Sequence, residues 1–221
     1  MKSTDKQPFG LTGNQLKIIA MITMTCDHVG LQLLPGIPLL RILGRLALPI
    51  YAWMIAEGCR HTRSRKNYLL RLVSMATLCQ LVYFFAMGSL YMCILVTFSL
   101  SVCLIWVWEE GKKPWLAPLA TVAVFFLCVT LPRLLPGFYV DYGLAGVLLP
   151  VLIYFGKPRV LFLCIGLGLL ALSSGGVQWW AFAAVPALMA YNGQRGRANL
   201  GRLFYWYYPI HLAVIYLLSL L

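Results

Sequence analysis

Long runs of apolar residues, separated by short polar or basic stretches, follow one another along almost the whole chain. The runs are continuous and do not alternate between apolar and polar positions, so they predict helices and not membrane β-strands. Most could cross the hydrocarbon core of a bilayer, which is about 30 Å thick. We expect nine spans, over residues 16–34, 38–59, 68–87, 90–108, 115–131, 142–155, 160–173, 177–191 and 203–221. The sixth and seventh are short, and we expect them to be tilted, broken or re-entrant.

The composition agrees with an all-α, polytopic transmembrane helical bundle. Hydrophobic residues make up 61% of the 221 positions, and the mean hydropathy is +0.82. The first run is too long for a cleavable signal peptide and contains Asp27 and His28, so we expect it to remain in the protein. The seven cysteines are scattered and form no C-x-x-C pair, so neither a disulfide framework nor a metal site is expected.

The net charge of +12 is distributed unevenly. With the N-terminus in the cytoplasm, the cytoplasmic segments carry fifteen of the basic residues, whereas Arg133 is the only one in an outer loop. The fifteen are Lys2, Lys6, Lys17, Arg60, Arg63, Arg65, Lys66, Arg71, Lys112, Lys113, Lys157, Arg159, Arg195, Arg197 and Arg202. This positive-inside bias predicts an N-in, C-out topology and accounts for the charge without nucleic acid. We expect a short cytoplasmic arm over residues 1–15 and one membrane domain over residues 16–221, with no internal repeat.

Ionisable residues lie inside the predicted spans, where they are costly and usually functional. At 1.5 Å per residue, His28 in the first span and Arg45 in the second lie at similar depths. The short connection between these spans makes them antiparallel neighbours, so Asp27 and Arg45 are expected to pair and offset each other's desolvation. His28 would then be free to act as a base. The alternative is a purely structural polar cluster that holds the two helices together.

Lys17 lies eleven residues before His28. Eleven residues make three helical turns with little angular drift, so both side chains share one helix face, about 16 Å apart. A cation at the cytoplasmic mouth and an imidazole near the middle would suit a ligand that enters from the cytoplasm. Lys17 could equally be an ordinary anchor whose ammonium reaches the interface.

The end of the second span is rich in charge. Arg60, His61, Arg63 and Arg71 could form a basic rim that recognises a phosphorylated ligand. The positive-inside rule offers an equally simple explanation for each of them. Glu57 is the exception, because it is acidic; it either pairs with the cluster or orients His61.

Two further features lie near the C-terminus. The turn that contains Asn192 and Arg195 has two glycines, so it could present backbone N–H groups and arginines to an anion, or simply end a helix. In the last span, Pro209 removes a backbone N–H, and His211 follows it near the bilayer midplane. A histidine just beyond a proline is not typical of a plain membrane anchor.

Together these residues resemble the TraX family. The resemblance runs in order from about residue 14 to the C-terminus. It rests on Lys17-Ile18-Ile19-Ala20, Asp27-His28, Arg41-x-x-Gly44-Arg45-x-x-x-Pro49, Glu57-Gly58-x-x-His61-Thr62, Tyr68-x-x-Arg71-Leu72, Asp141-Tyr142-Gly143, Asn192-Gly193-x-Arg195-Gly196 and Phe204-Tyr205-x-x-Tyr208-Pro209-x-His211-Leu212. The resemblance implies a multipass acetyltransferase of the inner (plasma) membrane, since the family's named member N-acetylates a pilin subunit. It also makes Asp141, Tyr142 and Tyr208 candidate functional residues. The spacing of Lys17 and His28 resembles the wider transmembrane acyltransferases, where the basic residue is usually arginine.

The expected function is therefore transfer of an acetyl group from cytoplasmic acetyl-CoA to an amine or hydroxyl of a peptide, glycan or lipid acceptor. His28 would act as general base, Asp27 would hold Arg45, and Arg45, with His211 or Tyr208, would stabilise the thioester oxygen. The phosphates of acetyl-CoA would meet Lys17, Arg60, Arg63, Arg71 and Arg195.

Two other functions remain open at this point. The same Asp, His and Arg side chains could relay protons in a small transporter or flippase, although the lack of a repeat disfavours it. A non-catalytic scaffold would not need so many buried ionisable groups. No protease or hydrolase signature is present. The acceptor and the oligomeric state do not follow from the sequence.

Overall fold

The structure is a computed structural model and describes residues 9–111, 113–197 and 200–220. Residues 1–8 of the predicted N-terminal arm lie outside the described residues. The chain divides into two compact units, one formed by the residues up to Ile50 and from Trp180 onward, and the other by Tyr51–Trp179.

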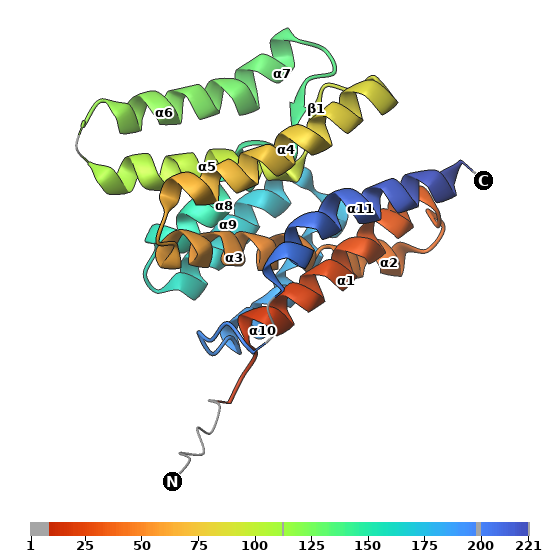
Figure 1. Ribbon diagram of the computed structural model, residues 1–221, viewed down its shortest axis with the longest axis horizontal. Coiled ribbons are helices and arrows are strands. Elements are labelled where there is room, and N and C mark those ends of the chain that lie inside the picture. Colours follow the sequence, from red (N-terminus) through yellow and green to blue (C-terminus); the bar gives the residue numbers. More distant parts are fainter. Residues whose placement is uncertain (1–8, 112, 198–199, 221) are drawn as a thin grey trace. The chain divides into compact units, whose positions relative to one another are not determined.

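The described residues of the first unit are mostly helical. Its elements are α1 (Gly13–Gln32), α2 (Pro38–Gly44), α10 (Val185–Met189) and α11 (Gly201–Ser219). Helices α2 and α11 both pack against α1, as Figure 1 shows. A capping box starts α1, in which the Thr12 hydroxyl accepts from the Gln15 N–H and the Gln15 side chain accepts from the Thr12 N–H.

The second unit is also mostly helical. Its elements are α4 (Arg65–Met87), β1 (Tyr91–Met92), α5 (Ile94–Glu110), α6 (Leu116–Phe125), the π-helical turn η1 (Phe126–Thr130), α7 (Leu131–Leu134), β2 (Tyr139–Val140), α8 (Gly143–Phe155) and α9 (Arg159–Ser174). Helix α3 (Ala47–His61) and the 3₁₀-helix η2 (Gly176–Ala184) each cross a boundary between the units.

Helix α5 is central in the second unit, because it packs against α4, α6 and α8, and α8 in turn packs against α9 (Figure 1). Strands β1 and β2 pair in parallel, with Tyr91 opposite Tyr139. A buried apolar cluster fills the space between these elements; it consists of Leu104, Val124, Cys128, Val140 and Val147. Helix α4 ends at Gly88, whose positive φ of 59° suits a residue without a side chain.

Each of the nine predicted segments falls on a helical stretch of the described residues, but that all nine cross a membrane stays a prediction. The first predicted span is α1, the second comprises α2 and α3, the fifth comprises α6, η1 and α7, and the last is α11. Among the described residues, three helical stretches are long and apolar enough to cross a membrane, namely Pro38–His61, Arg65–Phe85 and Leu116–Leu134. The protein is therefore a helical membrane protein, and α4 carries outward-facing apolar side chains such as Leu81 and Phe85, as contact with lipid requires.

Candidate functional site

An ionic cluster in the first unit joins α1 to α2. The Asp27 carboxylate on α1 binds Arg41 through Oδ2, 2.8 Å from the arginine Nη1, and binds Arg45 through Oδ1. Arg45 also donates from Nε to the Arg41 carbonyl, at 3.3 Å. The predicted pairing of Asp27 with Arg45 is confirmed. The sequence reasoning missed the role of Arg41, although its position one helical turn before Arg45 indicates a shared face.

The cluster carries one net positive charge, because one carboxylate serves two guanidinium groups. Arg45 is only 7% exposed, whereas Arg41 is 26% exposed. Arg41 is therefore the cation that a bound ligand could reach more easily. Charge in such a setting is costly unless it is paired, so the excess favours an anionic or polarised ligand nearby.

Two histidines from opposite ends of the chain meet beside this cluster. His28 Nδ1 on α1 lies 3.1 Å from His211 Nε2 on α11, and their ring centroids are 5.0 Å apart. Asp27, Arg41 and Arg45 are close enough for their charges to interact electrostatically with the His28 ring. Asp27, His28, Arg45 and His211 thus lie close together, and their catalytic role stays a prediction.

Aromatic and hydroxyl groups surround the histidine pair. The Tyr207 ring stacks on His211 with 5.2 Å between centroids, and its hydroxyl lies 2.6 Å from the Thr25 hydroxyl. Tyr208 is buried and meets the His211 ring edge-on. Thr25 and Tyr207 were not singled out from the sequence, although they lie about one turn before His28 and His211 respectively.

Lys17 and Arg195 lie at the N-terminal end of α1 and near each other. The Lys17 ammonium lies 5.1 Å from the centre of the Phe204 ring on α11. The positive charge of Arg195 is close enough to interact electrostatically with that of Lys17. The Arg195 side chain is exposed. Since Lys17 and His28 both contact α11, the prediction that they share one face of α1 is confirmed.

Asn192 organises this end of the first unit. Its side-chain oxygen accepts from the Gln194 N–H, its side-chain nitrogen donates to the Gly10 carbonyl, and its backbone N–H donates to the Leu11 carbonyl. The following carbonyls of Gln194 and Arg195 accept from the first N–H groups of α1. Asn192 therefore shapes the turn that carries Arg195.

Glu57 forms a second ionic cluster, in the second unit. Its carboxylate lies 2.6 Å from Arg159 Nη2, 3.5 Å from Arg60 Nη1 and 3.4 Å from His61 Nε2. The expected pairing of Glu57 with the basic cluster is confirmed, and Glu57 also contacts His61. Arg159 was not predicted as its partner; its guanidinium also lies 4.1 Å from the centre of the Trp53 ring.

The basic residues of this cluster differ in what they can still bind. Arg60 donates from Nη2 to the carbonyls of Ile153 and Tyr154, so its guanidinium caps the C-terminal end of α8. Arg63, Arg71 and His61 are exposed. These three predicted phosphate ligands are therefore accessible, whereas Arg60 is largely committed to the fold.

Asp141 and Tyr142 lie at the opposite end of the second unit from Glu57. The Asp141 carboxylate accepts from the Tyr91 hydroxyl, its carbonyl accepts from Thr97, and its N–H donates to Met92. Tyr142 has a positive φ of 55° and precedes the first residue of α8. These contacts hold β1, β2 and α8 together, which is a structural task.

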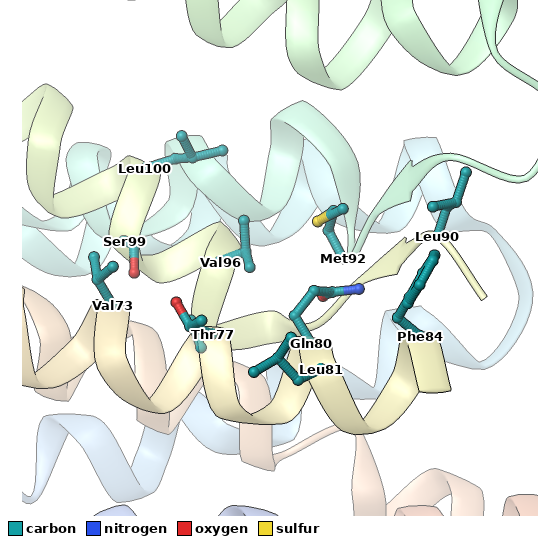
Figure 2. Close-up of a pocket in the computed structure, with 11 residues that line it drawn as sticks. Val73, Thr77, Gln80, Leu81, Phe84, Leu90, Met92, Val96, Ser99 and Leu100 are labelled. Carbon is teal, nitrogen blue, oxygen red and sulfur yellow. The ribbon is translucent and has the colours of Figure 1, made fainter. Parts of the chain in front are cut away.

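A groove of about 410 Å³ runs between α4 and α5 in the second unit (Figure 2). Apolar side chains such as Val73, Leu81, Phe84 and Leu100 line it, with Thr77 and Gln80 among the polar ones. No charged residue lines it, so it does not suit the phosphates of a nucleotide. In the part of the chain that the structure describes, no three His, Cys, Asp or Glu side chains gather as a metal site would require.

Comparison with known proteins gives a consistent picture. The family described as TraX protein matches residues 12–219. The chain is 27% identical, over 91% of its length and 93% of the other's, to the "Probable fimbrial assembly protein FimC, serogroup H1" of Dichelobacter nodosus. A short region, 17% of this chain and 15% of the other, is 47% identical to an uncharacterized protein of Rickettsia prowazekii (strain Madrid E). No solved structure matches.

Proposed function

We propose, on the premise that this chain belongs to the TraX family, that it is a membrane acyltransferase that moves an acetyl group from acetyl-CoA to an amine or hydroxyl. The observation that carries the proposal is the meeting of His28 and His211 beside the Asp27, Arg41 and Arg45 cluster. This site places a histidine base beside two arginine cations inside an apolar bundle, and acyl transfer uses both a base and cations.

The acceptor is proposed from the chemistry and from one relative. An amine or hydroxyl nucleophile near a membrane belongs to a membrane or cell-surface peptide, glycan or lipid. The relative from Dichelobacter nodosus is named for fimbrial assembly. A fimbrial or pilus subunit is therefore the first acceptor to test.

The chemical step is a direct transfer. His28 takes the proton from the acceptor amine or hydroxyl as the acceptor atom bonds to the acetyl carbonyl carbon. The carbon–sulfur bond of the thioester breaks, and the proton passes to the departing thiolate, which leaves as CoA thiol. Arg41, the more exposed cation, stabilises the carbonyl oxygen while it is negatively charged, and Arg45 holds Asp27 in place.

The donor is proposed to enter beside Lys17. Lys17 and the exposed Arg195 lie close together at the N-terminal end of α1, and the Asn192 turn fixes the backbone around them. Two cations at this point suit the phosphates of CoA. The α1–α11 face that leads from Lys17 to His28 covers eleven residues, about 16 Å, along which the thioester arm would extend.

The N-in, C-out topology with nine spans belongs to the same proposal, and the bacterial inner membrane is the expected location. Successive contacts between α1 and α11 advance together along both helices, from Lys17 with Phe204 to His28 with His211. The two helices are therefore parallel. Parallel first and last spans require an odd number of spans, which supports termini on opposite sides of the membrane.

Two measurements test the proposal. Purified protein should gain thermal stability as CoA or acetyl-CoA is added, because a ligand that binds only the folded state stabilises it more as the ligand concentration rises. Lys17→Ala with Arg195→Ala should weaken this effect. His28→Ala should abolish acetylation of the surface acceptor, measured by mass spectrometry, while expression stays normal. The absence of a thermal shift at millimolar acetyl-CoA would refute the assignment of acetyl-CoA as the acetyl donor.

A proton-coupled transporter is the second candidate, because two histidines in hydrogen-bond contact beside a carboxylate also suit a proton relay. Counter-flow of solutes in proteoliposomes without acyl-CoA separates the two functions. Counter-flow that is lost in His28→Ala would favour the transporter, and acetyl transfer without counter-flow would favour the enzyme.

A further inference from the structure

The contacts of the two histidines are specific to individual ring atoms. His28 Nδ1 lies 3.0 Å from the Met24 carbonyl and 3.1 Å from His211 Nε2. His211 Nδ1 lies 2.8 Å from the Tyr207 carbonyl. Each histidine therefore turns its Nδ1 atom toward the carbonyl one helical turn before it.

These carbonyls assign the protons. A carbonyl oxygen only accepts hydrogen bonds, so the Nδ1 atom that faces it must carry the hydrogen. For His211 this places the N–H at Nδ1 and leaves a lone pair at Nε2 in the neutral ring. The lone pair faces His28 Nδ1, whose own hydrogen is shared between the Met24 carbonyl and His211. The contacts agree with one another only in this arrangement.

We propose that His211 is a positioning residue, which accepts a hydrogen bond from His28 Nδ1 and so makes His28 Nε2 the proton-accepting atom of the site. Among the residues that the structure describes, none forms a hydrogen bond with His28 Nε2. This differs from a role for His211 as a donor to the thioester oxygen, because its Nε2 lone pair cannot donate.

The catalytic consequence rests on the proposed acyl transfer, whereas the proton assignment does not. The acceptor N–H or O–H would point at His28 Nε2, and its proton would move to that atom as the new bond to carbon forms. The resulting imidazolium keeps its Nδ1 hydrogen bond to His211, so the ring does not turn between accepting the proton and releasing it to the thiolate. His211 thus holds His28 in its reactive tautomer and orientation.

Nitrogen-15 NMR of the full-length protein, labelled at histidine and held in detergent micelles, tests the assignment directly. The chain has three histidines, and the third, His61, is 73% exposed and serves as an internal reference. His28→Ala and His211→Ala assign the signals. The expected result is a hydrogen on Nδ1 and a lone pair on Nε2 for both His28 and His211. A hydrogen on Nε2 of neutral His28 would overturn the proposal.

A matched pair of substitutions separates positioning from packing. The side-chain oxygen of glutamine at 211 reaches about as far as histidine Nε2 and can accept from His28, whereas the shorter asparagine cannot. We expect His211→Gln to keep the His28 tautomer and to retain transfer within about tenfold. His211→Asn should lose the tautomer and lower kcat by roughly 100-fold with little change in KM, since general-base catalysis contributes factors of this size.

The two proposals fail in different ways. Equal activity of the two variants, or a glutamine variant as inactive as the asparagine variant with the tautomer intact, would refute the positioning role. An unaltered protein that shows the expected tautomer but transfers no acetyl group to any acceptor would refute the acyltransferase and leave the proton assignment standing.

Discussion

At the residue scale, Gly44 is a position where α2 approaches α1 closely. A Cβ atom there would overlap the side chain and Cα of Asp27. Because Asp27 is also held by Arg41 and Arg45, it has little room to move aside. The absence of a side chain at position 44 is therefore part of how the ionic cluster is assembled.

We expect Gly44→Ala to lower the free energy of unfolding by about 1–3 kcal/mol, as overpacking typically does. Gly36→Ala is the matched control, since a Cβ there meets no atom of the described residues within 4 Å. Thermal unfolding in detergent measures both. Equal melting temperatures for the two variants would show that α2 does not approach Asp27 this closely.

A second residue-scale prediction concerns the charge balance at Asp27. Asp27→Asn should destabilise the protein by about 3–5 kcal/mol, because it removes the negative charge that two guanidinium groups share. If Asp27 were paired with Arg45 alone, adding Arg45→Gln to Asp27→Asn would restore most of the lost stability. With Arg41 also bound, that double variant should stay destabilised, and the triple variant with Arg41→Gln should recover most of the loss. Full recovery in the double variant would contradict the shared contact.

At the element scale, Glu57 connects the ends of α3 and α9 and steadies Arg60, which caps α8. The carboxylate is only 10% exposed, so water screens its ion pairs less than it would at the surface. These contacts bring three helix ends together in the second unit. The cluster therefore has a structural role whatever it binds.

We expect Glu57→Gln to lower the free energy of unfolding by about 2–4 kcal/mol through the loss of paired charge. Glu110→Gln is the control, because Glu110 is 56% exposed and lies 3.6 Å from Arg65, and exposed pairs contribute about 0–1 kcal/mol. Melting curves of both proteins in the same detergent provide the comparison. A control as unstable as Glu57→Gln would contradict the argument.

At the scale of the whole molecule, contacts in the second unit place its helix ends in two groups, one at each end of the unit. In the second unit, Arg65 at the start of α4 pairs with Glu109 near the end of α5, and Tyr154 near the end of α8 donates to the same carboxylate. At the other end, β1 follows α4 and pairs with β2, which precedes α8. Consecutive membrane crossings would produce this alternation.

This arrangement leads to a topology prediction. Reporter tags at the N-terminus and in the loops 60–67, 109–114 and 192–202 should be cytoplasmic, and a tag at the C-terminus should be external. Accessibility of tags to a membrane-impermeant reagent in intact cells measures this. A cytoplasmic C-terminus would contradict the nine-span count, and the short helices α8 and α9 would be the first to re-examine.

Much of the architecture could be predicted from the sequence, because apolar run length and charge bias act locally. The nine segments and the neighbouring positions of α1 and α2 follow from them, as does the pairing of Asp27 with Arg45. The partners contributed by distant helices could not be predicted in this way. Arg159 reaches Glu57 across 102 positions, and His211 reaches His28 across 183.

The amino-acid sequence alone indicated the helical membrane class, the outer ends of the helical segments to within a few residues and the set of ionisable residues that chemistry could use. It did not indicate the break between α2 and α3 inside the predicted 38–59 span. The tertiary structure alone decided which of these residues meet and through which atoms. Helical periodicity states which face a residue occupies but not which helix packs against that face. The side-by-side packing of α1 and α11 joins His28 to His211, and the close approach at Gly44 brings Arg41 and Arg45 onto one carboxylate.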